Sequence, residues 1–259
     1  MSLRPLILGH RGASAVAPEN TLAAFSRALI DGADGVEFDV RLSRDHIPVV
    51  IHDATLNRTG GVDRRVFDLT AQELQQIDAG SWFDKTQRNP AATFAGEKLP
   101  SLEQVYKFFS NNTGVLYVEM KCEKDEGAAL AERVAEFTRA FGLVGRVVVE
   151  SFDLSAIAAV KKIDAAIRTA ALFEPKLSRP LSSLLRQRMI AAALETGAHE
   201  IALHHSLASA RGVEKAKRAG MEVVVWTVDD PAWIETARAL GIKALIANNP
   251  AAMLCHRDL

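Results

Sequence analysis

Several classes of protein are excluded by what this sequence lacks. It has only two cysteines in 259 residues, Cys122 and Cys255, which are too few for a disulfide framework and lack the spacing of a metal-binding pair. Its N-terminal apolar run, Leu6–Leu8, is far shorter than a signal-peptide core or a membrane span. With 31 basic and 32 acidic side chains, its formal net charge of −1 is not that of a basic nucleic-acid binder. We therefore expect a cytoplasmic protein with free thiols, no nucleic-acid partner and no stable membrane insertion.

Short runs rich in β-branched residues alternate with longer amphipathic stretches along most of the chain. This alternation is typical of βα units around a parallel sheet, and the 48% hydrophobic composition is enough for a large core. The pattern predicts nine strands: Leu6–Gly9, Gly35–Arg41, Ile47–His52, Val115–Met120, Val147–Ser151, Arg168–Leu172, Glu200–His204, Glu222–Thr227 and Lys243–Ala247.

Two of these strands must form a hairpin. Gly35–Arg41 and Ile47–His52 are separated by five residues, which is too few for the crossover that joins parallel strands. The other eight run in one direction, and each is followed by a helical stretch except the last. Helix-start signals at Pro18–Thr21 and Asp230-Pro231 fit this order. The predicted fold class is therefore α/β, a TIM (β/α)8 barrel.

Residues 53–100 interrupt this rhythm. They contain repeated glycine and proline, one weak helical patch at Ala71–Ile77, and Trp82 and Phe83 as candidate anchors of a small core. We interpret residues 1–259 as one barrel domain, with this segment as a small inserted subdomain over the barrel mouth after the hairpin. A mobile loop is the alternative, although about 48 structureless residues are unusual within a compact domain.

Charged residues inside the predicted strands indicate the chemistry. In Gly35–Arg41 the apolar residues alternate with Glu37 and Asp39, so both carboxylates point away from the helices and into the barrel. The same alternation in Val115–Met120 sends Glu119 inward. Three clustered carboxylates repel one another unless a cation neutralises them, and all-oxygen ligands suit Mg²⁺ or Ca²⁺. We expect one divalent cation there. The alternative is a buried ion network with Arg11, Arg41 and Lys121.

Two histidines are predicted to flank these carboxylates. His10 directly follows the first strand, at the barrel face where active sites lie. His52 ends the return arm of the hairpin, and antiparallel pairing sets it opposite Phe38 and Asp39. Imidazole titrates near neutral pH, so the pair can act as general acid and general base. The order of residues does not say which histidine has which role, and either alone could be structural.

Other side chains at the strand ends are candidates for substrate binding. Arg11 and Lys121 add positive charge at the same mouth, which an anionic phosphate would require, although each could instead pair with a nearby carboxylate. Trp226 could cover a glycerol-sized group or fill the core. Glu150 and His204 are weaker candidates for polar lining.

These residues, taken in order, resemble the glycerophosphodiester phosphodiesterase family of the bacterial cytoplasmic type. The matching segments are His10-Arg11-Gly12, Pro18–Thr21, Gly35–Val40, Pro48–Asp53, Leu56–Thr59, Asp78–Trp82, Val118–Lys121, Ser151-Phe152 and Val225–Val228. One position departs from the family pattern, since Asn248 stands where a carboxylate is usual. We expect this change to affect the lining near Trp226 and not the metal centre.

The resemblance implies a TIM barrel with a small insertion and hydrolysis of glycerophosphodiesters to sn-glycerol 3-phosphate and an alcohol. It also implies that His10 and His52 are the acid/base pair, that Glu37, Asp39 and Glu119 hold the metal, and that Arg11 and Lys121 contact the phosphate. The nucleophile is left open between water and the glycerol 2-hydroxyl.

Two other functions remain as alternatives at this point. A lysophospholipase D would need an apolar groove at the mouth, for which Trp82, Phe83 and Phe94 are candidates. A non-catalytic barrel that binds a phosphate ligand would not need both histidines together with all three carboxylates.

Overall fold

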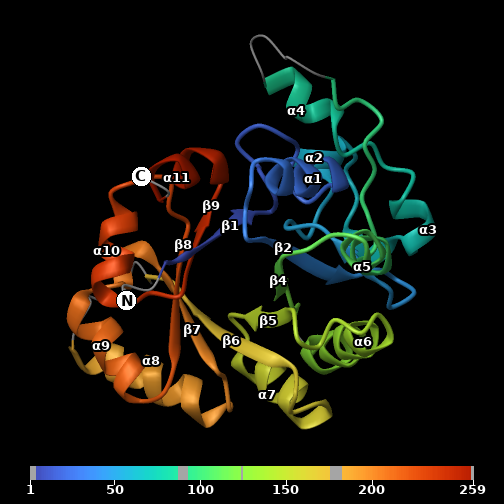
Figure 1. The fold of residues 1–259 in the computed structure, drawn as a ribbon. Helices are drawn as coiled ribbons and strands as arrows, with labels where there is room; N and C mark the ends of the chain where they lie inside the picture. The colour runs from blue at the N-terminus through green and yellow to red at the C-terminus, as the bar shows by residue number, and fades with distance from the viewer. Residues whose placement is uncertain (1–3, 87–92, 124, 176–182, 258–259) are drawn as a thin grey trace.

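Eight parallel strands close into a barrel in the computed structural model, which describes residues 4–86, 93–123, 125–175 and 183–257 (Figure 1). The strands are β1 Leu6–His10, β2 Gly35–Leu42, β4 Val115–Met120, β5 Val147–Ser151, β6 Arg168–Phe173, β7 Glu200–His204, β8 Glu222–Trp226 and β9 Ala244–Ala247. Each pairs in parallel with its neighbour, and β1 closes the barrel by pairing with both β2 and β9. The predicted TIM barrel is confirmed.

The predicted hairpin is confirmed as well. Strand β3, Pro48–Val50, runs antiparallel to β2, with Val40 opposite Val50 and Leu42 opposite Pro48. It is shorter than the predicted Ile47–His52, and on its other side the Val50 amide donates to the Pro100 carbonyl at 2.8 Å. The amide of Ile51 still donates to the Asp39 carbonyl at 3.0 Å, which keeps the next residue, His52, close to β2.

Helices cover the outside of the barrel. They are α1 Leu22–Ile30, α5 Leu102–Ser110, α6 Gly127–Ala140, α7 Leu154–Ile163, α8 Ser183–Glu195, α9 Ala210–Arg218, α10 Trp233–Leu240 and α11 Pro250–Arg257, with a short 3-10 turn at His205–Leu207. The predicted cap of α1 is confirmed, since the Thr21 hydroxyl accepts the Ala24 amide. None of the helices in the described ranges combines the length and apolar character that crossing a membrane requires.

The expectation that no helix follows the last strand is wrong, because α11 follows β9. The Asn249 side chain accepts the Ala252 amide at 3.2 Å, and Pro250 occupies the first helical position, where its missing N–H costs nothing. An Asn-Pro pair at a helix start was therefore the signal that the sequence analysis did not use.

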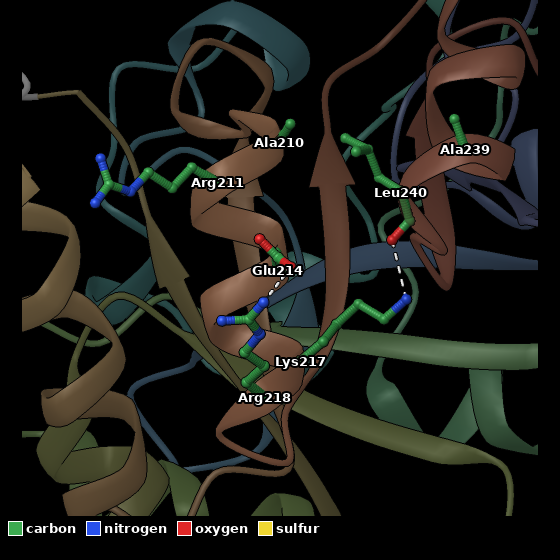
Figure 2. A pocket seen from close by; sticks show the side chains of 7 residues that line it. All are labelled: Ala210, Arg211, Glu214, Lys217, Arg218, Ala239 and Leu240. Atoms are coloured by element: carbon green, nitrogen blue, oxygen red, sulfur yellow. Dashed lines mark hydrogen bonds and ion pairs between the residues drawn. The ribbon is translucent and has the colours of Figure 1, made fainter.

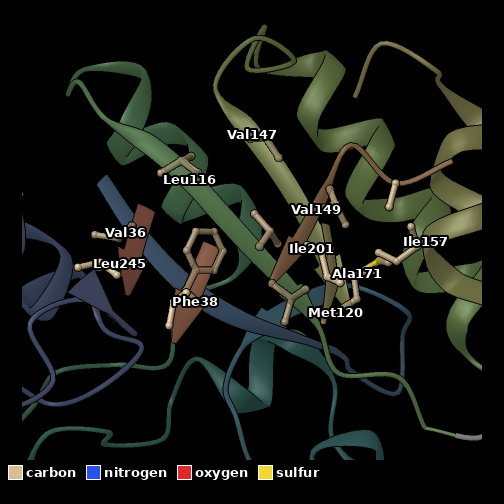
Figure 3. Packing of buried hydrophobic residues seen from close by; sticks show 14 of the residues in the cluster. Val36, Phe38, Leu116, Met120, Val147, Val149, Ile157, Ala171, Ile201 and Leu245 are labelled. Carbon is tan, nitrogen blue, oxygen red and sulfur yellow. The ribbon is translucent and has the colours of Figure 1, made fainter. Parts of the chain in front are cut away.

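The hydrophobic core has two layers, separated by the barrel wall. Outward-facing side chains such as Val36, Phe38 and Leu116 pack in one apolar cluster against the helices (Figure 3). The ring of Phe38 lies 5.4 Å from that of Phe25 on α1. Inward-facing side chains, among them Tyr117, form a smaller cluster inside the barrel. Because strand residues alternate between these layers, Glu37 and Asp39 point into the barrel, as predicted.

The segment between β3 and α5 contains more structure than the sequence indicated. It forms α2 Asn57–Gly60, a 3-10 turn at Val66–Asp68, α3 Ala71–Leu74 and α4 Ser81–Thr86, and in Figure 1 α4 is drawn at the top of the molecule and α3 at the right. The predicted helical patch is only the four-residue α3, and α2 and α4 were not predicted. A small apolar cluster that includes Leu56, Val66 and Leu74 holds the segment together. Such short helices depend on this packing more than on local propensity.

Candidate active site

Three buried carboxylates meet inside the barrel. Glu37 and Asp39 come from β2, and Glu119 comes from β4, where it lies opposite Asp39 in the parallel register. Their exposed fractions are 2%, 0% and 7%. One oxygen of each lies within 4.8 Å of the others, which is the spacing of a cation site. The structure thus brings together the three residues that the sequence analysis selected as metal ligands.

Both predicted histidines lie beside this cluster. His10 is opposite Glu37 in the register of β1 and β2, with its Nε2 3.9 Å from a Glu37 carboxylate oxygen. His52 follows the hairpin, and its Nδ1 is 2.6 Å from an oxygen of Asp53. Nδ1 of His10 is 2.7 Å from the side-chain amide oxygen of Asn248. The Nδ1 atoms of the two histidines therefore have different partners, an amide for His10 and a carboxylate for His52.

These groups line one cavity of about 200 Å³ at the mouth of the barrel, which we call the barrel-mouth cavity. Its walls are formed by His10, Arg11, Glu37, His52, Glu119, Lys121, Glu150, Phe152, Leu172, Glu174, Trp226, Thr227 and Ile246. Six of the seven residues assigned by the family resemblance are among them. The seventh, Asp39, is completely buried behind the wall.

Two cations stand next to the carboxylates. Lys121 Nζ lies 2.6 Å from Glu119 and 3.2 Å from Asp39, and Arg11 Nε lies 3.2 Å from Asp39. Part of the alternative ion network is therefore present. Arg41, however, donates to the His52 carbonyl at 2.7 Å and not to these carboxylates.

The two cations do not satisfy every carboxylate oxygen. Oxygen Oε1 of Glu37 is buried and has no hydrogen-bond partner in the described structure. Burial, followed by the charge of Asp39, raises the pKa of Glu37 well above its usual range and that of Glu119 to about 7. By contrast, Lys121 and Arg11 hold the pKa of Asp39 below its usual range even though burial alone would raise it. An all-oxygen, electron-rich site with an unpartnered oxygen fits a hard divalent cation.

Burial also acts on the histidines. It lowers the pKa of His10 to about 4, with a further contribution from the charge of Arg11. Burial, together with Arg11 and Lys121, lowers the pKa of His52, although Asp39 and Asp53 oppose the shift. Both shifts favour the neutral ring, the form that can accept a proton.

The loop after β1 positions Arg11 through its backbone conformation. Arg11 has φ +54° and Gly12 has φ +82°, and a Cβ on Gly12 would lie 2.6 Å from the Ala24 backbone. This turn allows the Arg11 amide to donate to Glu37 at 3.0 Å while its guanidinium reaches Glu19 at 2.8 Å. A side chain at residue 12 would force this loop away from α1.

Sequence reasoning missed three residues that orient the site. Asn20 was interpreted only as a helix-start residue, yet its amide donates to Asp39 Oδ2 at 2.9 Å and accepts the Asp39 amide. Asp53 was taken only as the start of the insertion, but it bonds His52. Glu19 holds both Arg11 and Arg58. All three lie within segments that carried the family resemblance, which was the available signal.

The expectation for Asn248 is wrong in its location. Its side chain bonds His10 and not the lining near Trp226, and its Nδ2 donates to Asp229 at 2.7 Å. The chain returns from β9 to the end of β1, so a residue 238 positions away contacts the first histidine.

The weaker lining candidates differ in where they lie. Glu150 and Trp226 line the barrel-mouth cavity. Within the described part of the chain, Glu150 Oε2 and Trp226 Nε1 are buried without a hydrogen-bond partner. Phe152 packs edge-on against Trp226 at 5.6 Å. His204 is not part of the lining; it packs edge-on against Trp226 at 5.3 Å and its Nδ1 contacts Ser206.

The aromatic side chains of the insertion do not line this cavity. Trp82 and Phe94 each pack edge-on against Phe83 at 5.7 Å, and Phe83 is 5% exposed. The apolar groove that a lysophospholipase D would require is therefore not formed by these three rings.

A larger cavity, of about 590 Å³, lies between α9 and α10 (Figure 2). Figure 2 shows that Arg218 pairs with Glu214 and that Lys217 donates to the Leu240 carbonyl at 3.0 Å, so these charged side chains form bonds within and between the two helices. It contains none of the predicted site residues. The chemistry-bearing groups are gathered in the smaller barrel-mouth cavity.

Comparison with known proteins finds relatives along nearly the whole chain. A profile of the glycerophosphoryl diester phosphodiesterase family matches residues 10–252. The YhdW protein of Bacillus subtilis is 32% identical over 244 residues, 94% of each chain. A glycerophosphodiester phosphodiesterase of Caldanaerobacter subterraneus is 29% identical over 252 residues, 97% of each chain.

A solved structure is similar along nearly its full length. It is that of an Oleispira antarctica phosphodiesterase in complex with the product sn-glycerol-3-phosphate. The TM-score is 0.85 at 26% identity, and the match covers 98% of this chain and 97% of the other. The similarity therefore extends over the whole barrel.

Proposed function

The chain belongs to the glycerophosphoryl diester phosphodiesterase family and is a glycerophosphodiester phosphodiesterase, and we propose that its site works with one divalent cation and two histidines. The observation that carries the proposal is a cluster of three buried carboxylates, two of which line the same cavity as His10 and His52. The proposed products are sn-glycerol 3-phosphate and an alcohol. The product bound to the Oleispira antarctica phosphodiesterase supports this choice.

Glu37, Asp39 and Glu119 would hold the cation, Mg²⁺ or Ca²⁺. Their oxygens are close together, and Glu37 Oε1 has no hydrogen-bond partner among the described residues. A bound cation supplies positive charge that offsets the charge developing on the phosphate oxygens. Asn20 keeps Asp39 oriented by accepting its amide and donating to its side chain.

Arg11 and Lys121 would bind the phosphodiester. Both line the cavity, and both are already paired with carboxylates, so their positions are held before substrate arrives. Positive groups that need not move during the reaction stabilise developing negative charge most effectively. Their contacts with carboxylates and with phosphate are compatible because each cation carries several donors.

The two histidines would move the protons. One removes a proton from the nucleophile as its oxygen bonds to phosphorus, and the other donates a proton to the leaving alcohol oxygen as the P–O bond breaks. The nucleophile is water or the glycerol 2-hydroxyl. Reaction in ¹⁸O-labelled water with trapping of a cyclic phosphate distinguishes them, and the absence of that product at every time point excludes the hydroxyl.

Trp226 and Glu150 would contact the polar groups of the substrate. Each is part of the cavity wall and has a buried polar atom, Nε1 of Trp226 and Oε2 of Glu150, that bonds to none of the described residues. A hydroxyl group could bond both, since it can donate and accept. His204 would support Trp226 by packing against its edge.

An activity panel tests this proposal. Enzyme stripped of metal would be supplied with Mg²⁺, Ca²⁺ or Mn²⁺ and assayed on glycerophosphocholine, glycerophosphoethanolamine and lysophosphatidylcholine. We expect cation-dependent release of glycerol 3-phosphate from the first two. Full activity with a chelator would contradict the role of the cation, and preference for lysophosphatidylcholine would instead support a lysophospholipase D.

A further inference from the structure

We propose that Asp229 is a positioning residue, which acts through Asn248 to determine which ring nitrogen of His10 carries the proton. This inference rests on the proposed role of His10 in proton transfer. Neither Asp229 nor Asn248 lines the barrel-mouth cavity. Their effect on the reaction is therefore exerted through the histidine and not through contact with substrate.

Asp229 lies in the loop after β8, and both of its carboxylate oxygens accept hydrogen bonds from the segment after β9. One carboxylate oxygen, Oδ1, accepts the backbone amides of Asn248 at 2.8 Å and Asn249 at 3.2 Å. The other, Oδ2, accepts the Asn248 side chain at 2.7 Å. A carboxylate only accepts, so the atom of Asn248 that faces it has to be the NH₂ group.

The NH₂ group and the oxygen of a side-chain amide point in different directions. Because the NH₂ group of Asn248 is directed at Asp229, its oxygen faces His10 Nδ1 at 2.7 Å and the Ser14 hydroxyl at 3.1 Å. That oxygen also only accepts, so His10 Nδ1 has to carry a hydrogen. In the neutral ring, Nε2 is then the nitrogen with the free lone pair, and it lies on the Glu37 side, 3.9 Å from the carboxylate.

These hydrogen bonds therefore leave Nε2 of His10, on the Glu37 side, as the nitrogen that can accept a proton. His52 obtains its orientation differently, because its Nδ1 contacts the Asp53 carboxylate directly. An amide can turn over and exchange its donor for its acceptor, whereas a carboxylate cannot. The orientation of His10 thus depends on Asp229, which prevents Asn248 from turning over.

Asp229→Asn is expected to reverse the direction of the hydrogen bonds that connect residue 229, Asn248 and His10. The oxygen of the new amide has to accept the two backbone amides, so its NH₂ group faces Asn248. Asn248 would then turn to present its oxygen to residue 229 and its NH₂ group to His10. His10 would have to accept at Nδ1 and carry its hydrogen on Nε2, which removes the lone pair from the cavity.

Two further variants separate this effect from a general loss of structure. Asn248→Asp alone places two carboxylates where Asn248 and Asp229 are now 2.7 Å apart, so that contact is lost. The double variant Asn248→Asp/Asp229→Asn exchanges amide and carboxylate. Its amide donates to the new carboxylate, which accepts from His10 Nδ1, and the original proton arrangement returns.

The matched control is Asp230→Asn. Asp230 is the next residue and is also exposed, and its carboxylate accepts the Ala232 amide at 2.9 Å. Within the described residues, its side chain forms no hydrogen bond with Asn248 or His10. We expect this variant to keep both the activity and the proton arrangement of the unaltered protein.

The first readout is ¹⁵N NMR of the ring nitrogens in protein labelled at its seven histidines, without metal and with Mg²⁺. The His10 signals are assigned by their loss in His10→Gln. We expect the proton on Nδ1 in the unaltered protein and the double variant, and on Nε2 in Asp229→Asn. Unchanged nitrogen signals in Asp229→Asn would overturn the inference.

The second readout is steady-state kinetics on glycerophosphocholine. Asp229→Asn and Asn248→Asp should each lower kcat by about 10²-fold or more with little change in KM, because the His10 ring loses its orientation while the cavity is intact. The double variant should recover kcat to within about tenfold of the unaltered enzyme. A double variant as inactive as Asn248→Asp would overturn the inference. If His10→Ala kept its activity, the proposed function would fail instead, while the NMR result would still report on Asp229.

Discussion

Asp39 on β2 and Glu119 on β4 lie directly opposite each other in the parallel register, and Lys121 Nζ bridges them at 3.2 Å and 2.6 Å. Their separation is set by the spacing of two hydrogen-bonded strands, so the barrel wall holds the carboxylates together even though they repel. A site built on strands is positioned more accurately than one built on loops.

Replacing a carboxylate of this pair should strongly weaken cation binding. Asp39→Asn and Glu119→Gln each remove a charged oxygen ligand, and we expect the affinity for Mg²⁺ or Ca²⁺ to fall by more than the 10- to 100-fold or so typical of changes around a ligand. Isothermal titration calorimetry measures this affinity. Glu103→Gln, at an exposed position on α5, is the control and should bind normally. Unchanged affinity in both site variants would contradict the assignment.

Cations should stabilise the folded protein more at pH 8 than at pH 5.5. Burial and the neighbouring Asp39 charge raise the pKa of Glu119 from 4.5 to about 7, and that of Glu37 is also raised. The folded state then retains protons that the unfolded chain has released. This contribution to stability is fully present below about pH 4.5 and is lost as the pH rises through the folded-state values.

A cation has to displace those protons, which is easier at high pH. The measurement is Tm with a chelator and with excess Mg²⁺ at both pH values. The increase in Tm that Mg²⁺ causes should be larger at pH 8, and an equal or larger increase at pH 5.5 would be evidence against a proton-linked site.

Removing either histidine should stop turnover without removing the cation. His10→Ala and His52→Ala each delete a proton-transfer group, and we expect kcat to fall by about 10²–10⁴-fold. Mg²⁺ binding should persist because the carboxylates remain. His256→Ala, on the exposed side of α11, is the control and should leave kcat unchanged. Near-normal turnover in either site variant would refute the two-histidine scheme.

Gly35 is required where β2 starts. A Cβ at this position would lie 2.0 Å from the Val115 carbonyl oxygen on β4. We expect Gly35→Ala to lower the free energy of unfolding by about 1–3 kcal/mol or more, since the backbone of a barrel strand has to move. Gly145→Ala is the matched control, because a Cβ there meets nothing within 4 Å. Denaturant unfolding of the two variants provides the comparison, and equal stabilities would contradict the prediction.

Much of the barrel and the core of the site was predictable from the sequence because both depend on local periodicity. The alternation of apolar and acidic residues around Phe38 determines which side chains of β2 face the helices. It therefore predicts that Glu37 and Asp39 face the inside of the barrel. The five-residue gap before Ile47 determined the hairpin and therefore the approach of His52.

The local pattern could not predict contacts between segments that are far apart in the sequence. Helices α2 and α4 of the insertion are too short to have a signal of their own. Packing supports both: Leu56, at the start of α2, lies in the apolar cluster of the insertion, and Phe83 of α4 packs against Phe94.

The partner of His10 was decided only by the tertiary structure. Closure of the barrel brings β9 against β1, and this places Asn248 on His10 and Asp229 on Asn248. The sequence by itself determined which of these residues face the barrel interior, because strand periodicity is a property of neighbours in the chain. Only the closed barrel decided how one of them is oriented, because a hydrogen bond depends on atoms meeting in space.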